Sequence, residues 1–464
     1  MQAGSVEQPL RLPLVAQIQN RSDSRTKDAR LINVYVEKDL NTEEYWVFKR
    51  PGCAVATDLT GAAGGTYNWN GDIYAVAGTT LYKNGVSIGT VAASGQYQFT
   101  DVRGVTPYLV LNNGTNQYYT NGTTVSTFTD PNFPTNLVPG WAYLDGTLYV
   151  MDRDAQIWGS QNLDDPLVWD PLNKIIARVE SDKGICLAKQ AVYVIAFKQY
   201  TTEAFYDAAN EAGSPLAPVQ GAKVDFGCAA ASTVRQMDGA LLWVTNNRAG
   251  SQQVALMNNL QLSIISTQPI ERQLSTWDFT QVQSSIVKVG GHKLYSISSP
   301  ADGVTLTYDL DQQIWYEWHD AAGTGHWPFV GGISNTAGQV LVQHATAGDL
   351  YYLDTQYTYP SDAGALIRAE IYTPNFDGGV SRVKHFQQMY VQADQTNVSD
   401  FLYVRWSDDD YQSWGIYRSF DLRQRRPSLP NCGSAHRRAF NFYHQSLQPL
   451  RLKSVSLVVD VGAL

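Results

Sequence analysis

Short runs of alternating apolar and polar residues recur along most of the chain, and a glycine turn precedes many of them. Between Trp141 and Trp158, Asp145-Gly146 supplies the positive φ that a tight turn needs, and Leu148 and Val150 then alternate with polar positions. The same arrangement recurs at Asn70-Gly71, Asp238-Gly239, Gly291 and Gly348. The pattern predicts a series of antiparallel β-hairpins.

The hairpins recur at a regular interval. Their apolar centres lie near Tyr74, Tyr108, Tyr149, Tyr193, Trp243, Tyr295 and Leu341. Partner strands are expected 8 to 13 residues further on, at Tyr82, Tyr118, Trp158, Phe205, Leu256, Tyr308 and Tyr351. Several short strands in each period of about 40 to 50 residues are typical of propeller blades. Helical solenoids share the period, but a two-residue alternation does not fit them. We therefore predict an all-β protein with a propeller of six to seven blades, in which the first two hairpins could share one blade.

The spacing changes at both ends of this repeat. Residues 1–60 are expected to form an N-terminal arm with two strand-like runs, which closes the ring or reaches a neighbouring subunit. Residues 61–362 form the predicted propeller, with a long Pro/Gly-rich loop over 210–227 that is functional or an interface element. Residues 363–464 contain about six longer strands without the glycine turns, which predicts a β-sandwich-like domain.

Composition supports a soluble all-β protein. The chain has 464 residues, of which 44% are apolar, 12% aromatic and only 17% charged. It has no basic segment followed by an apolar run and no apolar stretch near 18 residues, so we expect neither a signal peptide nor a stable membrane association.

Charge is divided unevenly along the chain. Residues 363–464 hold 12 Lys and Arg against 9 Asp and Glu, so with a net charge of −9 for the whole chain, residues 1–362 carry −12. An acidic wall repels nucleic acid, and a basic patch attracts acidic partners.

Motifs that carry chemistry are absent from the sequence. No nucleotide-binding loop, zinc-protease motif or serine-hydrolase motif occurs, and the four cysteines are too far apart for a zinc site, so they read as buried free thiols. The stretch Ser407 to Trp414 resembles the Asp box of sialidase-type propellers, which is a structural turn. We predict no catalytic residue, no cofactor and no metal.

Two groups of residues are candidates for structural or docking roles. The basic candidates for partner docking are Arg423, Arg425, Arg426, Arg437 and Arg438. The candidates for turns and core positions are Gly71, Gly146, Gly227, Gly291, Trp315 and Trp414.

Several segments together resemble one family, the packaged-DNA stabilisation proteins of short-tailed phages such as P22. The segments are Arg30-Leu31-Ile32-Asn33, Arg50-Pro51-Gly52, Glu203-Ala204-Phe205-Tyr206, Gly227-Cys228-Ala229-Ala230, Ile265 to Glu271, Gly291 to Tyr295, and Thr307-Tyr308-Asp309 leading to Trp315-Tyr316-Glu317-Trp318. They occur in the family's order and span most of the chain, whereas the last hundred residues resemble the family less distinctly.

The resemblance implies a structural tail hub, or nozzle, made in the host cytoplasm and located in the virion. A homohexamer below the portal and its adaptor would retain the packaged DNA and let it pass on ejection, with transient contact to the DNA. The implied partners are the head-to-tail connector, a tail needle or plug, and tailspikes or fibres. Acidic blade residues are expected to face the lumen. The alternatives are a carbohydrate-binding or glycoside-hydrolase propeller, favoured by the Asp-box-like turn, and a trimeric receptor-binding fibre component.

Overall fold

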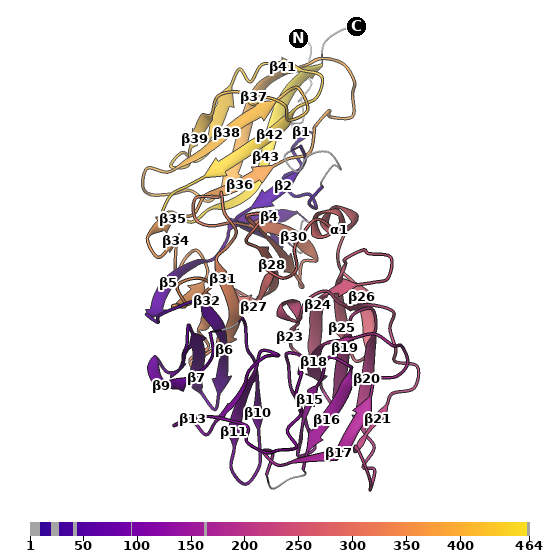
Figure 1. Ribbon diagram of the computed structural model, residues 1–464. Coiled ribbons are helices and arrows are strands. Elements are labelled where there is room, and N and C mark those ends of the chain that lie inside the picture. Colours follow the sequence, from indigo (N-terminus) through magenta and orange to yellow (C-terminus); the bar gives the residue numbers. More distant parts are fainter. Residues whose placement is uncertain (1–9, 20–26, 40–43, 94, 162–164, 462–464) are drawn as a thin grey trace, which may run out of the picture.

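The computed structural model describes residues 10–19, 27–39, 44–93, 95–161 and 165–461. Within these ranges the protein is built from strands, with one α-helix, α1 (Gln268–Leu274), and one short 3-10 helix, η1 (Ala231–Thr233). Figure 1 shows an elongated molecule in which a ring of small sheets occupies the lower part and longer strands extend above it.

Five small sheets follow one another along the chain, each made of consecutive antiparallel strands. The first sheet contains β6 (Ala63–Trp69), β7 (Asp72–Ala77), β8 (Thr80–Lys83) and β9 (Val86–Thr90). The second contains β10 (Gln98–Val102), β11 (Tyr108–Asn112), β12 (Gln117–Thr120) and β13 (Val125–Thr127). The third contains β14 (Ala142–Leu144), β15 (Thr147–Met151), β16 (Gln156–Ser160) and β17 (Trp169–Ile176). The next two are β18 (Gly184–Gln190), β19 (Tyr193–Lys198), β20 (Thr202–Asp207) and β21 (Leu216–Pro218), then β22 (Gly227–Cys228), β23 (Arg235–Met237), β24 (Ala240–Asn246), β25 (Val254–Asn258) and β26 (Gln261–Ile264). These are five evenly spaced blades of a β-propeller, which confirms the all-β propeller but not the predicted count of six to seven blades.

A larger, 15-stranded sheet continues the ring. It contains β27 (Gln283–Val289), β28 (His292–Ser299), β29 (Val304–Asp309) and β30 (Ile314–Trp318), and also β31 (Phe329–Ser334), β32 (Val340–His344) and β33 (Leu350–Asp354). From the N-terminal segment, β5 (Gly52–Thr57) pairs antiparallel with β33, and a parallel bridge joins β27 to β31. Two short strands, β34 (Ser361–Asp362) and β35 (Ala365–Leu366), extend the β5 edge.

Two sheets above the ring, here called the C-terminal sheet pair, combine strands from both ends of the chain. One sheet contains β1 (Leu10–Arg11), β3 (Val34–Lys38), β4 (Tyr45–Lys49), β37 (Lys384–Ala393), β40 (Ser428–Pro430), β41 (Ser434–Ala435) and β43 (Arg451–Val461). The other, continuous with β30, contains β2 (Arg30–Ile32), β36 (Ala369–Tyr372), β42 (Ala439–His444), β38 (Phe401–Ser407) and β39 (Arg418–Asp421).

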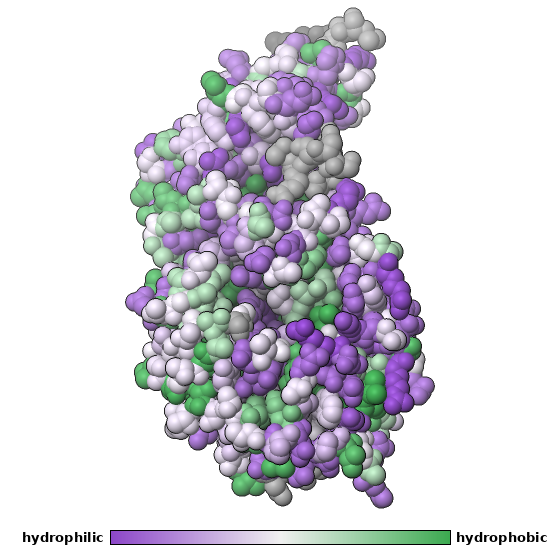
Figure 2. Space-filling model, viewed as in Figure 1, coloured by the Kyte–Doolittle hydropathy of each residue, from purple (hydrophilic) through white to green (hydrophobic). Residues whose placement is uncertain are grey.

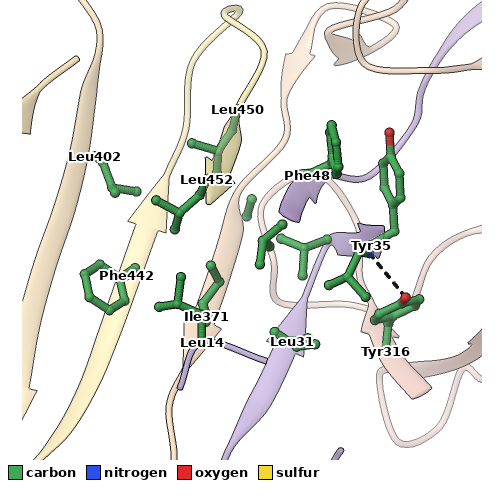
Figure 3. Packing of buried hydrophobic residues seen from close by; sticks show 14 of the residues in the cluster. Leu14, Leu31, Tyr35, Phe48, Tyr316, Ile371, Leu402, Phe442, Leu450 and Leu452 are labelled. Atoms are coloured by element: carbon green, nitrogen blue, oxygen red, sulfur yellow. Dashed lines mark hydrogen bonds between the residues drawn. The ribbon is translucent and has the colours of Figure 1, made fainter. Parts of the chain in front are cut away.

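One hydrophobic core runs from the ring into the C-terminal sheet pair. Tyr316 and Trp318 of β30 belong to the same buried cluster as Phe442 and Leu452, which lie on the two facing sheets. Figure 3 shows Tyr316, Phe442 and Leu452 among the members of this cluster, and the Tyr316 hydroxyl accepts a hydrogen bond from the Val36 amide at 3.2 Å. Burial of this continuous apolar surface holds the upper sheets to the ring.

The predicted strand positions agree with the structure. All seven predicted apolar centres lie on the second strand of a hairpin series, and all seven predicted partner residues lie on the strand that follows it. The first two hairpins, which we expected could share a blade, belong to separate sheets. The predicted run over 31–36 is interrupted at Asn33, whose φ of 53° separates β2 from β3.

Candidate functional site

The innermost strands of the ring surround an axial cavity of about 320 Å³. Strands β6, β10, β18, β23, β27 and β31 line it, together with Gly140 and Trp141 just before β14. Its lining is mixed, with Gln98, Thr100 and Gln236 beside apolar residues. The charged residues of the lining are Lys189 and Arg235. Figure 2 shows a hollow at the centre of the ring.

Hydrogen bonds cross this cavity. The Arg235 guanidinium donates to Gln96 Oε1 and to the Ser284 carbonyl oxygen, both at 3.0 Å, and so links three different sheets. Lys189 Nζ donates to the Tyr143 carbonyl oxygen at 2.6 Å. Burial lowers the pKa of Arg235, and the two acceptors bond to one terminal nitrogen of the guanidinium while its buried Nε has no partner among the described residues. The axis of the ring is thus occupied by ordered side chains.

A double-stranded DNA cannot fit in this cavity. A B-form duplex is at least about 16 Å across, judging from grooves about 8.5 and 7.5 Å deep, and it could not pass along this axis without displacing the side chains that hydrogen-bond across it. The cavity lining also carries no carboxylate. An acidic lining that repels DNA, as expected from the sequence, is therefore not found at the ring's own axis.

A second feature, here called the joint, connects the ring to the C-terminal sheet pair. The joint consists of Asn33, Arg50, His319 and Asp362. The Arg50 side chain is fully buried and donates to both oxygens of Asp362, at 2.9 and 2.5 Å. It also donates to Asn33 Oδ1 at 2.9 Å and to the His319 carbonyl oxygen at 3.1 Å. One guanidinium thus ties β2, β30, β5 and β34 together.

Asn33 completes the joint because of its left-handed backbone. Its side-chain nitrogen donates to the carbonyl oxygens of Asp320 and Arg368, and its oxygen accepts from the His319 amide at 2.8 Å. Gly52, next to the joint, has no room for a side chain, since a Cβ there would lie 2.1 Å from the Tyr359 carbonyl oxygen. The segments Arg30 to Asn33 and Arg50 to Gly52, which carried the family resemblance, therefore meet in space.

Other buried ionic groups lie near the joint. Lys49 is fully buried and donates to the carbonyl oxygens of Ser446 and Gln448, both at 2.8 Å. Burial lowers its pKa to about 8. His444 lies against the Asp400 carboxylate at 3.1 Å, and burial lowers the pKa of this histidine even so.

The predicted docking arginines differ in their exposure. Arg423, Arg425 and Arg426 lie in the exposed loop between β39 and β40, where Arg423 pairs with Asp421 at 2.7 Å. Arg437 is exposed in the β41–β42 loop. Arg438 is buried, pairs with both oxygens of Asp408 and packs over the rings of Phe386 and Trp406. Arg438 is thus an internal residue of the C-terminal sheet pair.

The predicted turn and core residues have distinct roles. Gly71, Gly146 and Gly291 have φ near 90° in tight turns. Gly227 lies in strand β22, where a Cβ would come within 2.4 Å of the Gln199 backbone. Trp315 is buried and donates to the Ile265 carbonyl oxygen. Trp414 is only half-buried, beside the rings of Tyr372 and Tyr411.

The Asp-box-like stretch is a turn, as predicted. Asp409 accepts from the Ser407 hydroxyl at 2.7 Å and from the Gln412 and Ser413 amides, and hydrogen bonds from Ser413 and Ser407 lower its pKa to about 2. All four cysteines are buried and unpaired, as predicted. Within the described ranges, no three His, Cys, Asp or Glu side chains gather closely enough to hold a metal ion. Among the same residues, no helix has the length and apolar character needed to cross a bilayer.

Sequence reasoning missed the joint as a unit. Asn33, Arg50 and Asp362 are more than 300 residues apart at the extremes, and nothing in the local pattern links them. The signal that was available is that two short motifs with polar residues, Arg30 to Asn33 and Arg50 to Gly52, both occur in an N-terminal segment that is otherwise rich in strand-forming residues. An arginine followed by Pro-Gly at the start of a strand was consistent with a structural role.

The fold and these sites define an all-β propeller whose axis is closed and whose best-organised polar cluster is structural. The chain belongs to the family described as Bacteriophage P22 Gp10, beta-propeller, whose model matches residues 10–358. It is therefore a member of a family of phage DNA-stabilisation and tail proteins, and its location is the virion. This confirms the family resemblance seen in the sequence.

Other comparisons concern more distant proteins. No curated protein matches the chain. Among solved structures, it is similar to the WD40 repeats of RRP9, with 9% identity, a TM-score of 0.42, and coverage of 66% of this chain and 99% of the other. The extracellular domain of the hybrid two-component system BT4673 from B. thetaiotaomicron gives 10% identity and a TM-score of 0.41, over 80% of this chain and 45% of the other.

Proposed function

We propose that this protein is a structural hub, or nozzle, of a short tail, in which several copies form a ring below the portal and its adaptor. The observation that carries the proposal is the closed axis of the propeller. Because the axial cavity cannot admit a duplex, a chain of this family can border a DNA channel only with the outer surface of its propeller. A ring of copies, six in our proposal, then encloses the conduit between them.

The net charge supports this arrangement. Residues 1–362 carry −12, although the axial cavity displays Lys189 and Arg235. The acidic groups therefore lie elsewhere on the propeller, where they can face a conduit between copies. A weakly repulsive wall lets a polyanion slide, whereas a basic wall would hold it by release of counterions.

The detailed architecture is also part of the proposal. We infer that β27 to β30 form a sixth blade and that β31 to β33 form a seventh, which β5 closes from the N-terminal side. We further propose a division into an arm and ring-closing strands over 1–60, a propeller over 61–362 and a β-sandwich over 363–464. The C-terminal sheet pair supports the sandwich, to which β1, β3 and β4 of the arm contribute.

The remaining partners are proposed on the same basis. The exposed arginines Arg423, Arg425, Arg426 and Arg437 are candidate contacts to the connector, the needle or plug, or the tailspikes and fibres. The protein acts without catalysis. The carbohydrate-active alternative gains no specific support, because the Asp-box carboxylate is used in holding its own turn.

A genetic depletion tests the function. Phage particles are assembled without this chain, and their DNA content is measured with and without purified protein present during assembly. The proposal predicts DNA loss from the depleted particles and retention where the purified protein was present. Full DNA retention in particles that demonstrably lack the chain would contradict it, as would turnover of a polysaccharide by the purified chain.

A further inference from the structure

The outward face of the sheet containing β36 carries an unusual layer of arginines and aromatic rings, here called the arginine–tyrosine layer. Its members are Arg30, Arg368, Tyr372, Tyr403, Arg405, Trp414, Tyr417 and Tyr443. The strand register places most of them on one face, since Arg30 lies opposite Tyr372 and Tyr403 lies opposite Tyr443. Their neighbours Leu31, Ile371 and Phe442 point the other way, into the core. The layer therefore lies on the side of this sheet that faces away from the core, where Tyr372 is only 9% exposed and the other members are half-buried.

The layer is held in one arrangement by contacts among its own members. The guanidinium of Arg30 lies 4.4 Å from the Tyr372 ring, that of Arg368 lies 4.6 Å from Tyr443, and that of Arg405 lies 4.6 Å from Tyr417. Each contact is a cation–π pair. Stacking of this kind fixes the long arginine side chains in advance, so a partner that binds them loses less conformational freedom.

Two buried polar residues beneath the layer position it. Glu370 accepts from Arg368 Nε and from Asn441 Nδ2, the latter at 3.0 Å. Asn441 Oδ1 in turn accepts from Arg405 Nε at 2.9 Å and from the Tyr417 hydroxyl at 3.0 Å. In both arginines the Nε is used internally, which leaves the two terminal nitrogens of each as the outward-facing donors. With three arginines and one glutamate, the layer is net positive.

Exposed apolar side chains border the layer at both ends. Ile416, next to Tyr417, is 86% exposed, and Leu366 and Leu447, close in sequence to Arg368 and Tyr443, are 40% and 53% exposed. Figure 2 shows apolar residues gathered at the left edge of the molecule, where Figure 1 places β34 and β35. The layer is rich in arginine, tyrosine and tryptophan and poor in lysine and acidic residues. The residues that contribute most of the binding energy in protein interfaces have this composition.

From this geometry we infer that the arginine–tyrosine layer is a docking surface for an acidic segment of another virion protein. The free guanidinium nitrogens match carboxylates, which accept two parallel hydrogen bonds, and the flanking leucines and isoleucine supply apolar contact. This deepens the proposed function and rests on it, because it names one surface through which the hub meets a partner. It also differs from the loop arginines Arg423, Arg425 and Arg426.

Ring geometry favours a protein over a nucleic acid. Bases of a single strand need successive open, roughly parallel ring faces. Here Tyr403 and Tyr417 meet at 81°, Tyr372 and Trp414 at 80°, and Tyr403 and Tyr443 stack on each other. Arginines cover further faces. The outward donors are thus chiefly the guanidinium edges, which suit carboxylates better than stacked bases.

Substitution of Ile416 tests the charge of the partner without disturbing the core. The full-length chain is added to particles made without it, and the bound fraction is measured by sedimentation. Ile416→Asp places a carboxylate beside the layer and is expected to weaken binding about tenfold, whereas Ile416→Lys is expected to leave it unchanged or tighten it. Equal effects of the two substitutions, or no effect of either, would overturn the inference.

Removal of the guanidiniums tests the layer itself. The double variant Arg368→Gln and Arg405→Gln should lose binding at least about tenfold, while a control with the same charge change, Arg103→Gln and Arg248→Gln on the propeller, should bind normally. Thermal unfolding shows whether the double variant is folded. If it is not, the binding result for Ile416→Asp tests the docking surface instead.

A single-stranded DNA of about 30 nucleotides serves as a second probe. If the double variant loses binding to this DNA but still binds the particles, the assignment of the surface to a protein partner is overturned. If the wild-type chain itself fails to bind the particles, the proposed function fails instead.

Discussion

The five small blades and the joint are held together by different kinds of contact. In the blades, each strand pairs with the next in the sequence, and two-residue turns such as Asp145-Gly146 set the register. In the joint, Arg50 bonds to Asp362 and to His319, partners that lie 312 and 269 residues away. The blades are therefore stabilised by many local hairpins, whereas the joint depends on a few buried polar groups from distant segments.

This difference indicates where the protein should be sensitive to change. A hairpin can lose one turn and keep its neighbours, because each blade buries its own apolar surface. A buried guanidinium such as that of Arg50, when it loses its carboxylate, keeps only neutral acceptors, and the cost of an uncompensated buried charge is high. We expect substitutions in the joint to cost more than substitutions in a blade.

The largest effect is predicted for Arg50→Met. Loss of the guanidinium leaves the Asp362 carboxylate without its cation and removes one of the two donors to the Asn33 oxygen, and should lower the free energy of unfolding by about 3–5 kcal/mol. Chemical denaturation of the wild type and the variant measures this change in the free energy of unfolding. Arg103→Met serves as the control, since the Arg103 side chain is 86% exposed. A change below about 1 kcal/mol would show that the joint is not a stabilising unit. Removing Asp362 as well, by Asp362→Leu, should restore part of the loss.

A smaller effect is predicted for Gly146→Ala in a blade. Gly146 has a φ of 88°, and a Cβ in this conformation costs about 1–2 kcal/mol. Gly415→Ala is the matched control, because its Cβ would meet only the Trp406 carbonyl oxygen, at an ordinary 3.6 Å. Equal melting temperatures for the two variants would show that the turn does not determine the hairpin register.

The smallest effect is a pH dependence caused by Lys49. Burial lowers its pKa to about 8 from 10.5, so the unfolded chain binds more protons than the folded chain above pH 8, and stability contributed by this residue rises with pH. Between about pH 7 and 8.5, the wild type should gain about 1 kcal/mol relative to Lys49→Met. Because the wild type and Lys49→Met are compared at each pH, the contribution of the buried thiols to the pH dependence cancels. A constant difference across this range would contradict the shift.

The sequence predicted the blades well because their signals are local. Positive-φ turns and two-residue alternation around Tyr149 or Tyr295 determine a hairpin without reference to the rest of the chain. The joint and the arginine–tyrosine layer could not be predicted in this way, since they form only after strands from both chain ends pair. Arg438 illustrates the point: it stood among exposed arginines in the sequence, yet the fold buries it against Asp408. Arg405, by contrast, is aligned with Arg30 and Arg368 only by the register of β2, β36, β42 and β38.

The central claim is that the propeller is a wall and not a conduit. Electron cryomicroscopy of the DNA-filled particle tests it most directly, through the position of the DNA density relative to each propeller. The account predicts a ring of copies, with DNA density on the ring's symmetry axis, outside every propeller, and with the axial cavity around Arg235 free of DNA. Density for DNA running through the axis of a single propeller, or no ring of this chain in the tail, would contradict it.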